Sequence, residues 1–350
     1  MLRSGPRNLI TDVDGFAVGN AHDVQLLSGV TVVLPERGAV AAVDVRGGGP
    51  GTRETDTLDP AASVQEVNAI VLSGGSAFGL AAADGAMAWL AERNRGFNVG
   101  GAIVPIVPAA ILFDLNNGGD KQWGVEPPYR RLGYSACNAA GADFALGNEG
   151  AGLGARAGNI KGGLGSVSAV GDDGLQVGAL IAVNARGFVT MGDQPQFWAW
   201  PWEQGGEFGG LAPPTARVPL DNVVDRGDAA GAAGASLLRG HTTIGVVATN
   251  ARLSKSEARR IAIMAQDGYA RAIRPVHTMF DGDAIFVLAG GGHELAEPRA
   301  LALSRLGGVA ADCVARACAR GVHAAENAGN MVSWRHRFGR PLKGAGEGRP

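Results

Sequence analysis

Hydrophobic residues fall into short runs separated by glycine-rich and polar segments along the whole 350-residue chain. Such runs, when rich in β-branched side chains, have the length of buried strands. We expect strands at residues 30–34, 39–45, 69–72, 166–170, 175–184, 243–249 and 284–289, and a strand or edge segment, broken by two prolines, at 103–115. The turn sequences PERG and GDDG predict two hairpins, one from the first two of these strands and one from the strands at 166–170 and 175–184.

Three longer segments have a helical pattern. One follows the turn SGGSAFG and is rich in small residues, and we expect Ser76 to be its N-cap. The second occupies residues 255–273, because Ser254 and Glu257 have the spacing of a capping box and Pro275 ends the pattern. The third is alanine-rich and occupies residues 301–326. Hairpins with the helices grouped apart from them indicate the α+β class.

Composition and charge exclude several functional classes. The chain has 31 basic and 33 acidic residues, well mixed, so no basic block predicts a nucleic-acid partner. No apolar stretch has membrane-spanning length, and the N-terminus MLRSGPRNLITDVDG lacks the apolar core of a signal peptide. We therefore expect a cytoplasmic protein without a membrane partner. The 56 glycines predict many tight turns and close backbone approaches.

One long segment departs from this regular pattern. Residues 192–240 are rich in Gly, Pro and Asp and contain Trp198, Trp200 and Trp202. We interpret the segment as a surface excursion with an aromatic anchor, and a stacking site for a ligand is the alternative.

The common catalytic and metal signatures are absent. Around Ser76 the G-x-S-x-G spacing fails because Phe78 occupies the second glycine position. The six histidines include no pair four residues apart and no H-E-x-x-H motif, and the three cysteines have no metal-ligand spacing. We expect neither a metal nor an organic cofactor.

Four polar residues lie close to predicted strand ends. Asp281 and Asp283 precede the strand at 284–289, Lys161 lies among glycines in GNIKGGLGS, and Asn184 ends the strand at 175–184. If the chain is extended there, both carboxylates point to one face. For each residue alone, a solvated turn is the competing interpretation.

A threonine at the start of a buried strand has its own chemistry. Thr242 follows the loose segment immediately before the strand at 243–249. If the chain is cut before a threonine, the new α-amine, with a pKa of about 7.7–8.0, is a base beside the hydroxyl. Asp281, Asp283 and Lys161 are the residue types that could fix and polarise that hydroxyl.

Seven ordered segments resemble the self-processing amidohydrolase family of β-aminopeptidases, L-aminopeptidase/D-Ala-esterase-amidases and nylon-oligomer hydrolases. They span nearly the whole chain and read ITDVDGFAVGNAHD, GGGPGTRETDTLDP, AIVLSGGSAFGLAAADG, NIKGGLGS, AVNARG, TTIGVVATNARLSK and ARAIRPVHTMFDGD. The nylon-oligomer hydrolase branch looks most similar, because threonine begins TTIG where aminopeptidase relatives usually carry serine.

The resemblance implies a fold and a maturation step. The fold is an αββα sandwich similar to that of N-terminal nucleophile hydrolases, formed by residues 1–350 as a single domain. The chain would cleave itself between His241 and Thr242 into residues 1–241 and 242–350, which remain associated, and would assemble into a homotetramer or larger. His241 stands where the family usually has asparagine or glycine.

The resemblance also implies site roles. Thr242 would be the nucleophile, Asp281 and Asp283 would hydrogen-bond its amine and hydroxyl, Lys161 would activate the hydroxyl or stabilise charge, and Asn184 would donate to the oxyanion. The implied activity is hydrolysis, through a threonine acyl-enzyme, of short amides of ω-amino or β-amino acids such as 6-aminohexanoate oligomers.

Three alternatives remain at this stage. An aminopeptidase or D-amino-acid amidase of the same family would use the same nucleophile. An acyltransferase of the same fold would use an amine as acceptor in place of water. A non-catalytic relative would stay uncleaved.

Overall fold

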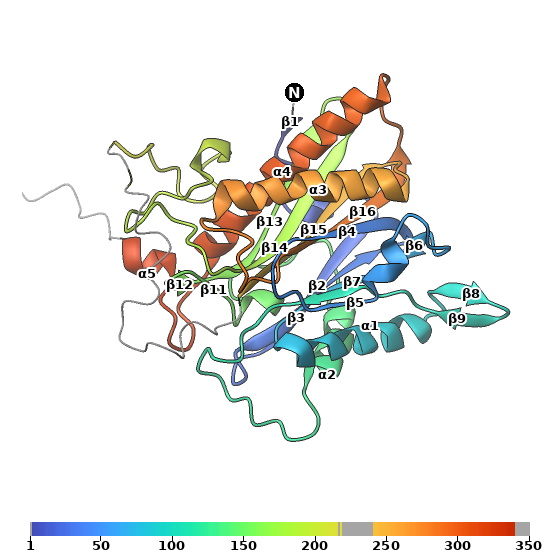
Figure 1. The fold of residues 1–350 in the computed structure, drawn as a ribbon, viewed down its shortest axis with the longest axis horizontal. Coiled ribbons are helices and arrows are strands. Elements are labelled where there is room, and N and C mark those ends of the chain that lie inside the picture. Colours follow the sequence, from blue (N-terminus) through green and yellow to red (C-terminus); the bar gives the residue numbers. More distant parts are fainter. Residues whose placement is uncertain (1, 216–217, 219–240, 340–350) are drawn as a thin grey trace, which may run out of the picture.

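The computed structural model describes residues 2–215, 218 and 241–339, and in these ranges the chain forms four layers. Two β-sheets lie face to face, and helices cover the outer face of each sheet (Figure 1). This arrangement is the predicted αββα sandwich of the α+β class.

The larger sheet has seven strands, and one of them begins at Thr242, directly after the bond where cleavage is predicted. In order across the sheet these are β1 (Leu2–Arg3), β13 (Gly163–Gly171), β14 (Gln176–Asn184), β15 (Thr242–Ala251), β16 (Ala284–His293), β4 (Ala39–Val45) and β6 (Glu66–Val67). Strand β15 is antiparallel to β14 and parallel to β16.

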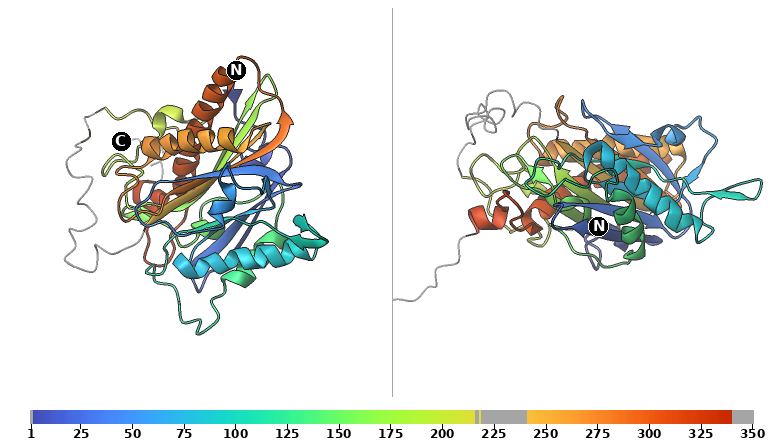
Figure 2. Two further views of the ribbon diagram at one scale, coloured as in Figure 1. Left: turned by 45° about the vertical axis from the view of Figure 1, so that its right-hand side comes forward. Right: turned by 90° about the horizontal axis from the view of Figure 1, so that it is seen from below.

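The smaller sheet has five strands, and two short hairpins lie outside both sheets. The five strands are, in order, β2 (Phe16–Asp23), β3 (Ser28–Pro35), β7 (Ile70–Ser73), β10 (Ala109–Ile111) and β5 (Thr52–Arg53). Strand β11 (Arg156–Ala157) pairs with β12 (Ile160–Lys161), and β8 (Phe97–Val99) pairs with β9 (Ala102–Val104). The β8–β9 hairpin extends away from the layered body (Figure 2).

Helices cover the two outer faces. The helices α3 (Lys255–Ala272) and α4 (Arg299–Ala324) pack on the seven-stranded sheet, and α1 (Ala82–Ala91) and α2 (Tyr129–Asn138) pack on the five-stranded sheet. The short α5 (Trp334–Phe338) follows α4. The predicted capping box of α3 is confirmed, because Ser254 accepts from the Glu257 N–H and Glu257 accepts from the Ser254 N–H.

The five long strands of the seven-stranded sheet, β13, β14, β15, β16 and β4, present one face to the other sheet and one to the helices. In β15, Ile244, Val246 and Ala248 belong to the core between the sheets, and Val247 belongs to the core under α3 and α4. Because side chains alternate along a strand, Thr242 faces the five-stranded sheet with Ile244, and Thr243 faces the helices.

One predicted hairpin is correct and the other is wrong. Strands β13 and β14 pair across GDDG as expected. Strands β3 and β4 flank PERG but do not pair, because β3 pairs with β2 and β7, and β4 pairs with β16 and β6. Turn residues and alternation predict a reversal of the chain, but they do not say whether the next strand returns to the same sheet.

The predicted capping role of Ser76 is also wrong. A 3-10 helix, η3 (Ser76–Ala81), precedes α1, and its N-cap is Gly75 in the left-handed conformation, with φ of 84°. Ser76 is the first residue of η3, and no side chain caps this end.

The excursion that begins at residue 192 is anchored by phenylalanines, as far as the structure describes it. Phe197 and Phe208 are 2% and 1% exposed and contact each other edge to face, and Phe197 also stacks on Trp334. The predicted aromatic anchor is therefore present but does not consist of the tryptophans. The part of the excursion at 219–240 and the tail after residue 339 lie outside the described residues.

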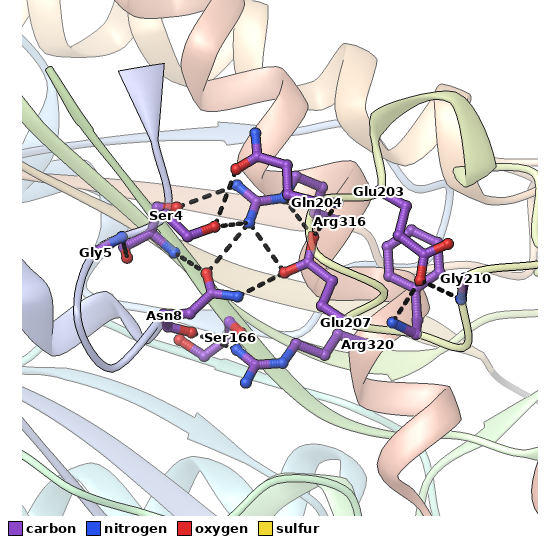
Figure 3. Close-up of polar contacts among 12 residues, drawn as sticks. Ser4, Gly5, Asn8, Ser166, Glu203, Gln204, Glu207, Gly210, Arg316 and Arg320 are labelled. Atoms are coloured by element: carbon purple, nitrogen blue, oxygen red, sulfur yellow. Dashed lines mark hydrogen bonds and ion pairs between the residues drawn. The ribbon is translucent and has the colours of Figure 1, made fainter. Parts of the chain in front are cut away.

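A buried ion pair fastens this excursion to α4 (Figure 3). The Arg316 Nε and Nη2 atoms lie 2.6 and 2.9 Å from the two carboxylate oxygens of Glu207, and the side chains are 1% and 5% exposed. Arg316 also donates to the Ser168 carbonyl and to the side chains of Ser4 and Asn8. The guanidinium thus joins the N-terminal segment, the excursion and the C-terminal helix.

No helix in the described ranges is long and apolar enough to cross a membrane. Cys137, Cys313 and Cys318 are all buried as free thiols, as small hydrophobic residues would be.

Arg316→Met should lower the free energy of unfolding by about 3–5 kcal/mol, because it leaves Glu207 buried without its partner. Urea denaturation of the purified chain measures the change. Arg305→Met is the matched control, because the Arg305–Asp173 pair is about half exposed and its removal should cost at most about 1 kcal/mol. Equal effects of the two substitutions would contradict a structural role for the buried pair.

Candidate active site

The candidate site lies where β14 ends and β15 begins. Asn184, the last residue of β14, is the direct partner of Thr242, the first residue of β15. Thr242 is 3% exposed and Asn184 is 2% exposed. Two of the predicted site residues are therefore adjacent across neighbouring strands.

The peptide bond before Thr242 is held in a defined position. The Thr242 hydroxyl donates to the carbonyl oxygen of His241, and the Gly282 N–H donates to the same oxygen at 3.0 Å. The His241 N–H in turn donates to the carbonyl of Phe280 at 3.0 Å. A hydroxyl thus lies against a carbonyl group that a backbone N–H already polarises, which is the arrangement needed to stabilise negative charge on that oxygen.

Asp281 and Asp283 are both buried, so the interpretation as solvated turn residues is wrong. They are 1% and 2% exposed. Asp281 accepts from the Arg186 N–H at 3.1 Å and from the N–H and hydroxyl of Thr278 at 2.9 and 2.5 Å. Asp283 accepts from the Thr243 N–H at 2.7 Å, while its second oxygen lies 2.8 Å from Nδ1 of His277.

The two carboxylates flank Thr242 without bonding to it among the described contacts. Burial, and secondly the nearby charge of Asp283, raise the pKa of Asp281 above its usual range. Asp283 bonds to the backbone of the residue after Thr242. The predicted hydrogen bonds from these carboxylates to a free Thr242 amine and hydroxyl remain predictions, since Thr242 is here joined to His241.

A glycine-rich loop supports this acidic turn. The Arg46 N–H donates to the Asp283 carbonyl at 2.9 Å, and the Gly49 N–H donates to the Asp281 carbonyl at 2.8 Å. At Gly47 a Cβ atom would lie 2.3 Å from the Asp283 nitrogen, so a side chain cannot fit. The sequence predicts this segment only as a loop; its role is to fix the turn from Asp281 to Asp283.

Lys161 is fully buried, so a solvated lysine in a turn is also excluded. Its exposed fraction is 0%, and its Nζ donates to the carbonyls of Gly152 at 2.7 Å and Gly162 at 3.0 Å. Burial lowers the pKa of Lys161 to about 7, an effect that the charge of Asp114 partly offsets. A lysine in this state exchanges its proton near neutral pH, which suits either proposed role.

The Asn184 side chain is oriented by two backbone groups. Its Nδ2 donates to the Phe113 carbonyl at 2.9 Å, and its Oδ1 accepts from the Arg156 N–H at 2.9 Å. The amide nitrogen carries a second hydrogen, which can serve an oxyanion near Thr242. Asn184 is thus a buried strand residue and not a turn former.

A small cavity of about 30 Å³ adjoins these groups. Its lining includes Phe113, Asp114, Asn116, Asn117, Gly154, Arg156, Asn184, His241 and Met331. A larger surface hollow of about 960 Å³ lies along α1, α2 and the segment at 120–128, and none of the predicted site residues lines it. The small cavity is the relevant one, because Asn184 and His241 line it.

The sequence missed three contributors to the site: Gly282, His277 and Asp114. Gly282 stands between the two predicted aspartates, and a Cβ there would lie 2.7 Å from the Thr242 hydroxyl oxygen. The spacing D-G-D could have drawn attention to it, but the contact with Thr242 is visible only in three dimensions.

Among the described residues, no group of three or more His, Cys, Asp or Glu side chains is placed to hold a metal ion.

Lys161→Met should change how stability depends on pH. The folded chain releases the Lys161 proton near pH 7, and the unfolded chain releases it near about 10.4. Between these values the unfolded state binds more protons, so this group makes the wild-type free energy of unfolding rise with pH. The stability of the Met variant relative to wild type should therefore be greatest at pH 7 and below and should decrease toward pH 10. Parallel urea-unfolding curves across this range would contradict the lowered pKa.

Comparison with known proteins places this chain in a family. A model of peptidase family S58 matches residues 8–333. An uncharacterized aminopeptidase of Mycobacterium tuberculosis (strain ATCC 25618 / H37Rv) is 47% identical over 348 residues, covering 95% of this chain and 98% of the relative. A 6-aminohexanoate-oligomer endohydrolase of Kocuria sp. (strain KY2) is 28% identical, covering 81% of this chain and 76% of the relative.

The fold is also similar to that of a solved structure. The L-aminopeptidase D-Ala-esterase/amidase of Ochrobactrum anthropi, a variant of the Ntn hydrolase fold, has a TM-score of 0.70 at 20% identity, with 94% of this chain and 89% of the other covered. This confirms the predicted similarity of the fold to that of N-terminal nucleophile hydrolases. Because the family model spans nearly the whole chain and a relative over its full length is 47% identical, the chain belongs to peptidase family S58.

Proposed function

We propose that this peptidase is a self-processing amidohydrolase whose nucleophile is the Thr242 hydroxyl. The observation that carries the proposal is the position of this hydroxyl against the His241 carbonyl, whose oxygen also accepts the Gly282 N–H. Hydroxyl attack on that carbonyl carbon forms a C–O bond. The C–N bond to Thr242 then breaks, and the nitrogen takes up the hydroxyl proton to become an amine.

The product of this step is an ester, which water hydrolyses to release residues 1–241 from residues 242–350. The new α-amine of Thr242, with a usual pKa of about 7.7–8.0, then serves as the base for the hydroxyl of the same residue. Asp281 and Asp283 would accept from this amine and hydroxyl, and Asn184 would donate to the oxyanion, a contribution worth about 3–4 kcal/mol. Lys161 would activate the hydroxyl or stabilise charge.

The two fragments would stay together after the cut. Strands β14 and β15 belong to different fragments and pair from Val177 opposite Thr249 to Asn184 opposite Thr242. Both are buried in the middle of the seven-stranded sheet, so separation would expose its core. Assembly of the mature protein into a homotetramer or larger remains a proposal from the family resemblance.

The proposed substrate class rests on similarity to the family and not on contacts in the structure. We propose short amides of ω-amino or β-amino acids, including 6-aminohexanoate oligomers, hydrolysed through a Thr242 acyl-enzyme without a metal or organic cofactor. A related protein that is 28% identical is named as an endohydrolase of these oligomers. Aminopeptidase activity is the second candidate, and the name of the relative that is 47% identical favours it.

Purified wild-type protein should contain a fragment whose N-terminal sequence is Thr-Thr-Ile-Gly. Thr242→Ala should remain a single chain and lose amide hydrolysis, because one oxygen atom serves both reactions. Thr243→Ala is the control and should mature, since its hydroxyl faces the helices. Denaturing mass spectrometry and N-terminal sequencing measure the outcome. An inactive Thr243→Ala beside an active Thr242→Ala would place the nucleophile one residue later.

Gly282→Ala should block or greatly slow maturation in a protein that still folds. The added Cβ would lie 2.7 Å from both the Thr242 hydroxyl oxygen and the Gly49 carbonyl oxygen, so the attacking group and the polarising N–H must move apart. Gly308→Ala, in α4, is the matched control, because a Cβ there meets nothing within 4 Å. The fraction of cleaved chain over time is the measurement. Normal maturation of Gly282→Ala would refute the role given to its N–H.

A further inference from the structure

Two neighbouring residues of the segment RPVHTMFDGD, His277 and Thr278, have no part in the proposed mechanism, although each contacts one of its carboxylates. The His277 N–H and ring Nδ1 lie 3.2 and 2.8 Å from Oδ2 of Asp283. The Thr278 N–H and hydroxyl donate to Oδ2 of Asp281 at 2.9 and 2.5 Å. Each residue thus contacts one oxygen of one carboxylate twice, through its backbone and through its side chain.

The contacts of His277 leave Asp283 an acceptor position on the side of β15. A carboxylate oxygen accepts about two hydrogen bonds. Among the described residues, Oδ2 of Asp283 has two partners, both from His277, and Oδ1 has one, the Thr243 N–H at 2.7 Å. The remaining position is therefore on Oδ1, which is already bonded to the residue after Thr242. His277 determines in this way which oxygen stays available beside the predicted nucleophile.

The conformation of His277 makes the double contact possible. Its φ is 55°, in the left-handed region that few side chains other than those of Asn, Asp and His adopt readily. Its ring also packs on the buried Tyr269, with the ring centroids 6.2 Å apart. His277 is not among the residues that line the small cavity, so it acts on the site through Asp283.

The direction of the His277–Asp283 bond decides where the charge of this acidic turn lies. Two adjacent buried carboxyl groups do not both ionise easily. Burial is the main reason that the pKa of Asp281 lies above its usual range, and the charge of Asp283 is the second. A ring that donates from Nδ1 favours the charged form of Asp283, because a hydrogen bond to a carboxylate stabilises it. A ring that accepted at Nδ1 would instead require a protonated Asp283.

We propose that His277 is a positioning residue that donates from Nδ1 to Asp283, keeps this carboxylate charged and directs its Oδ1 to the Thr242 amine. This rests on the proposed function, because it assumes that Thr242 becomes the N-terminal nucleophile. In the uncut chain, the bond from His277 holds Asp283 against the Thr243 N–H and so fixes Thr242 beside the His241 carbonyl. In the mature enzyme, the charged Asp283 accepts one hydrogen of the new amine.

Asparagine and aspartate at position 277 separate a donor from an acceptor at nearly constant size, and both tolerate a left-handed backbone. The Asn side-chain nitrogen can take the place of the ring Nδ1 and donate to Asp283, whereas an ionised Asp has no hydrogen to donate and repels that carboxylate. His277→Asn should therefore be cleaved at a rate close to that of wild type. His277→Asp should be cleaved about tenfold more slowly or worse, as expected for loss of a hydrogen bond to a charged group.

The fraction of cleaved chain, followed by denaturing mass spectrometry after cell-free synthesis, measures these rates. Asn94→Asp is the matched control, because Asn94 is exposed and has a φ of 53°, so the same two side chains are exchanged in the same backbone conformation far from the site. It should be cleaved like wild type. Equal rates for the two variants at position 277, or slow cleavage of His277→Asn, would overturn the inference. A wild-type chain that is never cleaved would refute the proposed function instead.

A second measurement needs neither cleavage nor a folded His277→Asp. Nitrogen NMR of the Thr242→Ala chain, labelled in its histidines and kept at neutral pH, reports which ring nitrogens carry a proton, and the signal lost in His277→Asn identifies His277. Its Nδ1 should carry a proton, whether or not Nε2 carries one as well. A proton on Nε2 alone would show that Asp283 donates in this bond, and it would overturn the inference even if maturation proceeds as proposed.

Discussion

The pairing of β14 with β15 fixes Thr242 opposite Asn184, and the rest of the candidate site is arranged around that pair. Because side chains alternate along a strand, a shift of one residue would turn Thr242 toward the helices and bring Thr243 to the site. The apolar residues that follow make such a shift costly, since Ile244, Val246 and Ala248 would all leave the core between the sheets. The hydrophobic pattern of β15 therefore determines which threonine faces the acidic turn.

Local patterns in the sequence predict the elements well but not how they are placed. The capping box at Ser254 and the GDDG turn involve residues near one another in the chain, so the sequence alone is sufficient to identify α3 and the β13–β14 hairpin. The PERG turn fails as a hairpin because β3 and β4 enter different sheets, a choice that depends on contacts far away in the sequence. The layered fold was predicted from the family resemblance and not from the pattern.

The same limit applies to the site. Family motifs identified Thr242, Lys161, Asn184 and the two aspartates, and the structure buries all five of them. Gly282 and Asp114 were missed because their contacts are visible only in three dimensions. Gly282 matters because its N–H donates to the His241 carbonyl, and Asp114 matters because it lines the cavity together with His241 and Asn184. Neither property can be read from residue type or spacing.

The buried charged residues described in this chain differ in whether an oppositely charged side chain is bonded to them. This difference distinguishes residues that stabilise the fold from residues that could take part in a reaction. Arg316 is surrounded by acceptors on three segments and meets both oxygens of Glu207, as a structural ion pair should. Lys161 donates to two backbone carbonyls among the described residues, and burial lowers its pKa to about 7. Asp114 accepts from the Gly75 N–H and has a hydrogen bond with the Ser28 hydroxyl, and burial raises its pKa. A buried charged group without a directly bonded opposite charge has a shifted pKa and can take part in proton exchange.

The contacts on the two sides of the His241–Thr242 bond are also compatible with the proposed cut, because they differ in what they hold in place. On one side, the His241 N–H donates to the Phe280 carbonyl, and the His241 carbonyl accepts from the Gly282 N–H. On the other side, the Thr243 N–H bonds to the Asp283 carboxylate, and Thr242 belongs to a ten-residue strand in the middle of the sheet. In the proposed cleavage, loss of the first set would release the acyl side, while the second set would keep the new amine in place. The proposed nucleophile, Thr242, would then change from an internal to a terminal residue without moving, provided that the nearby carboxylates accept the hydrogens of the new amine.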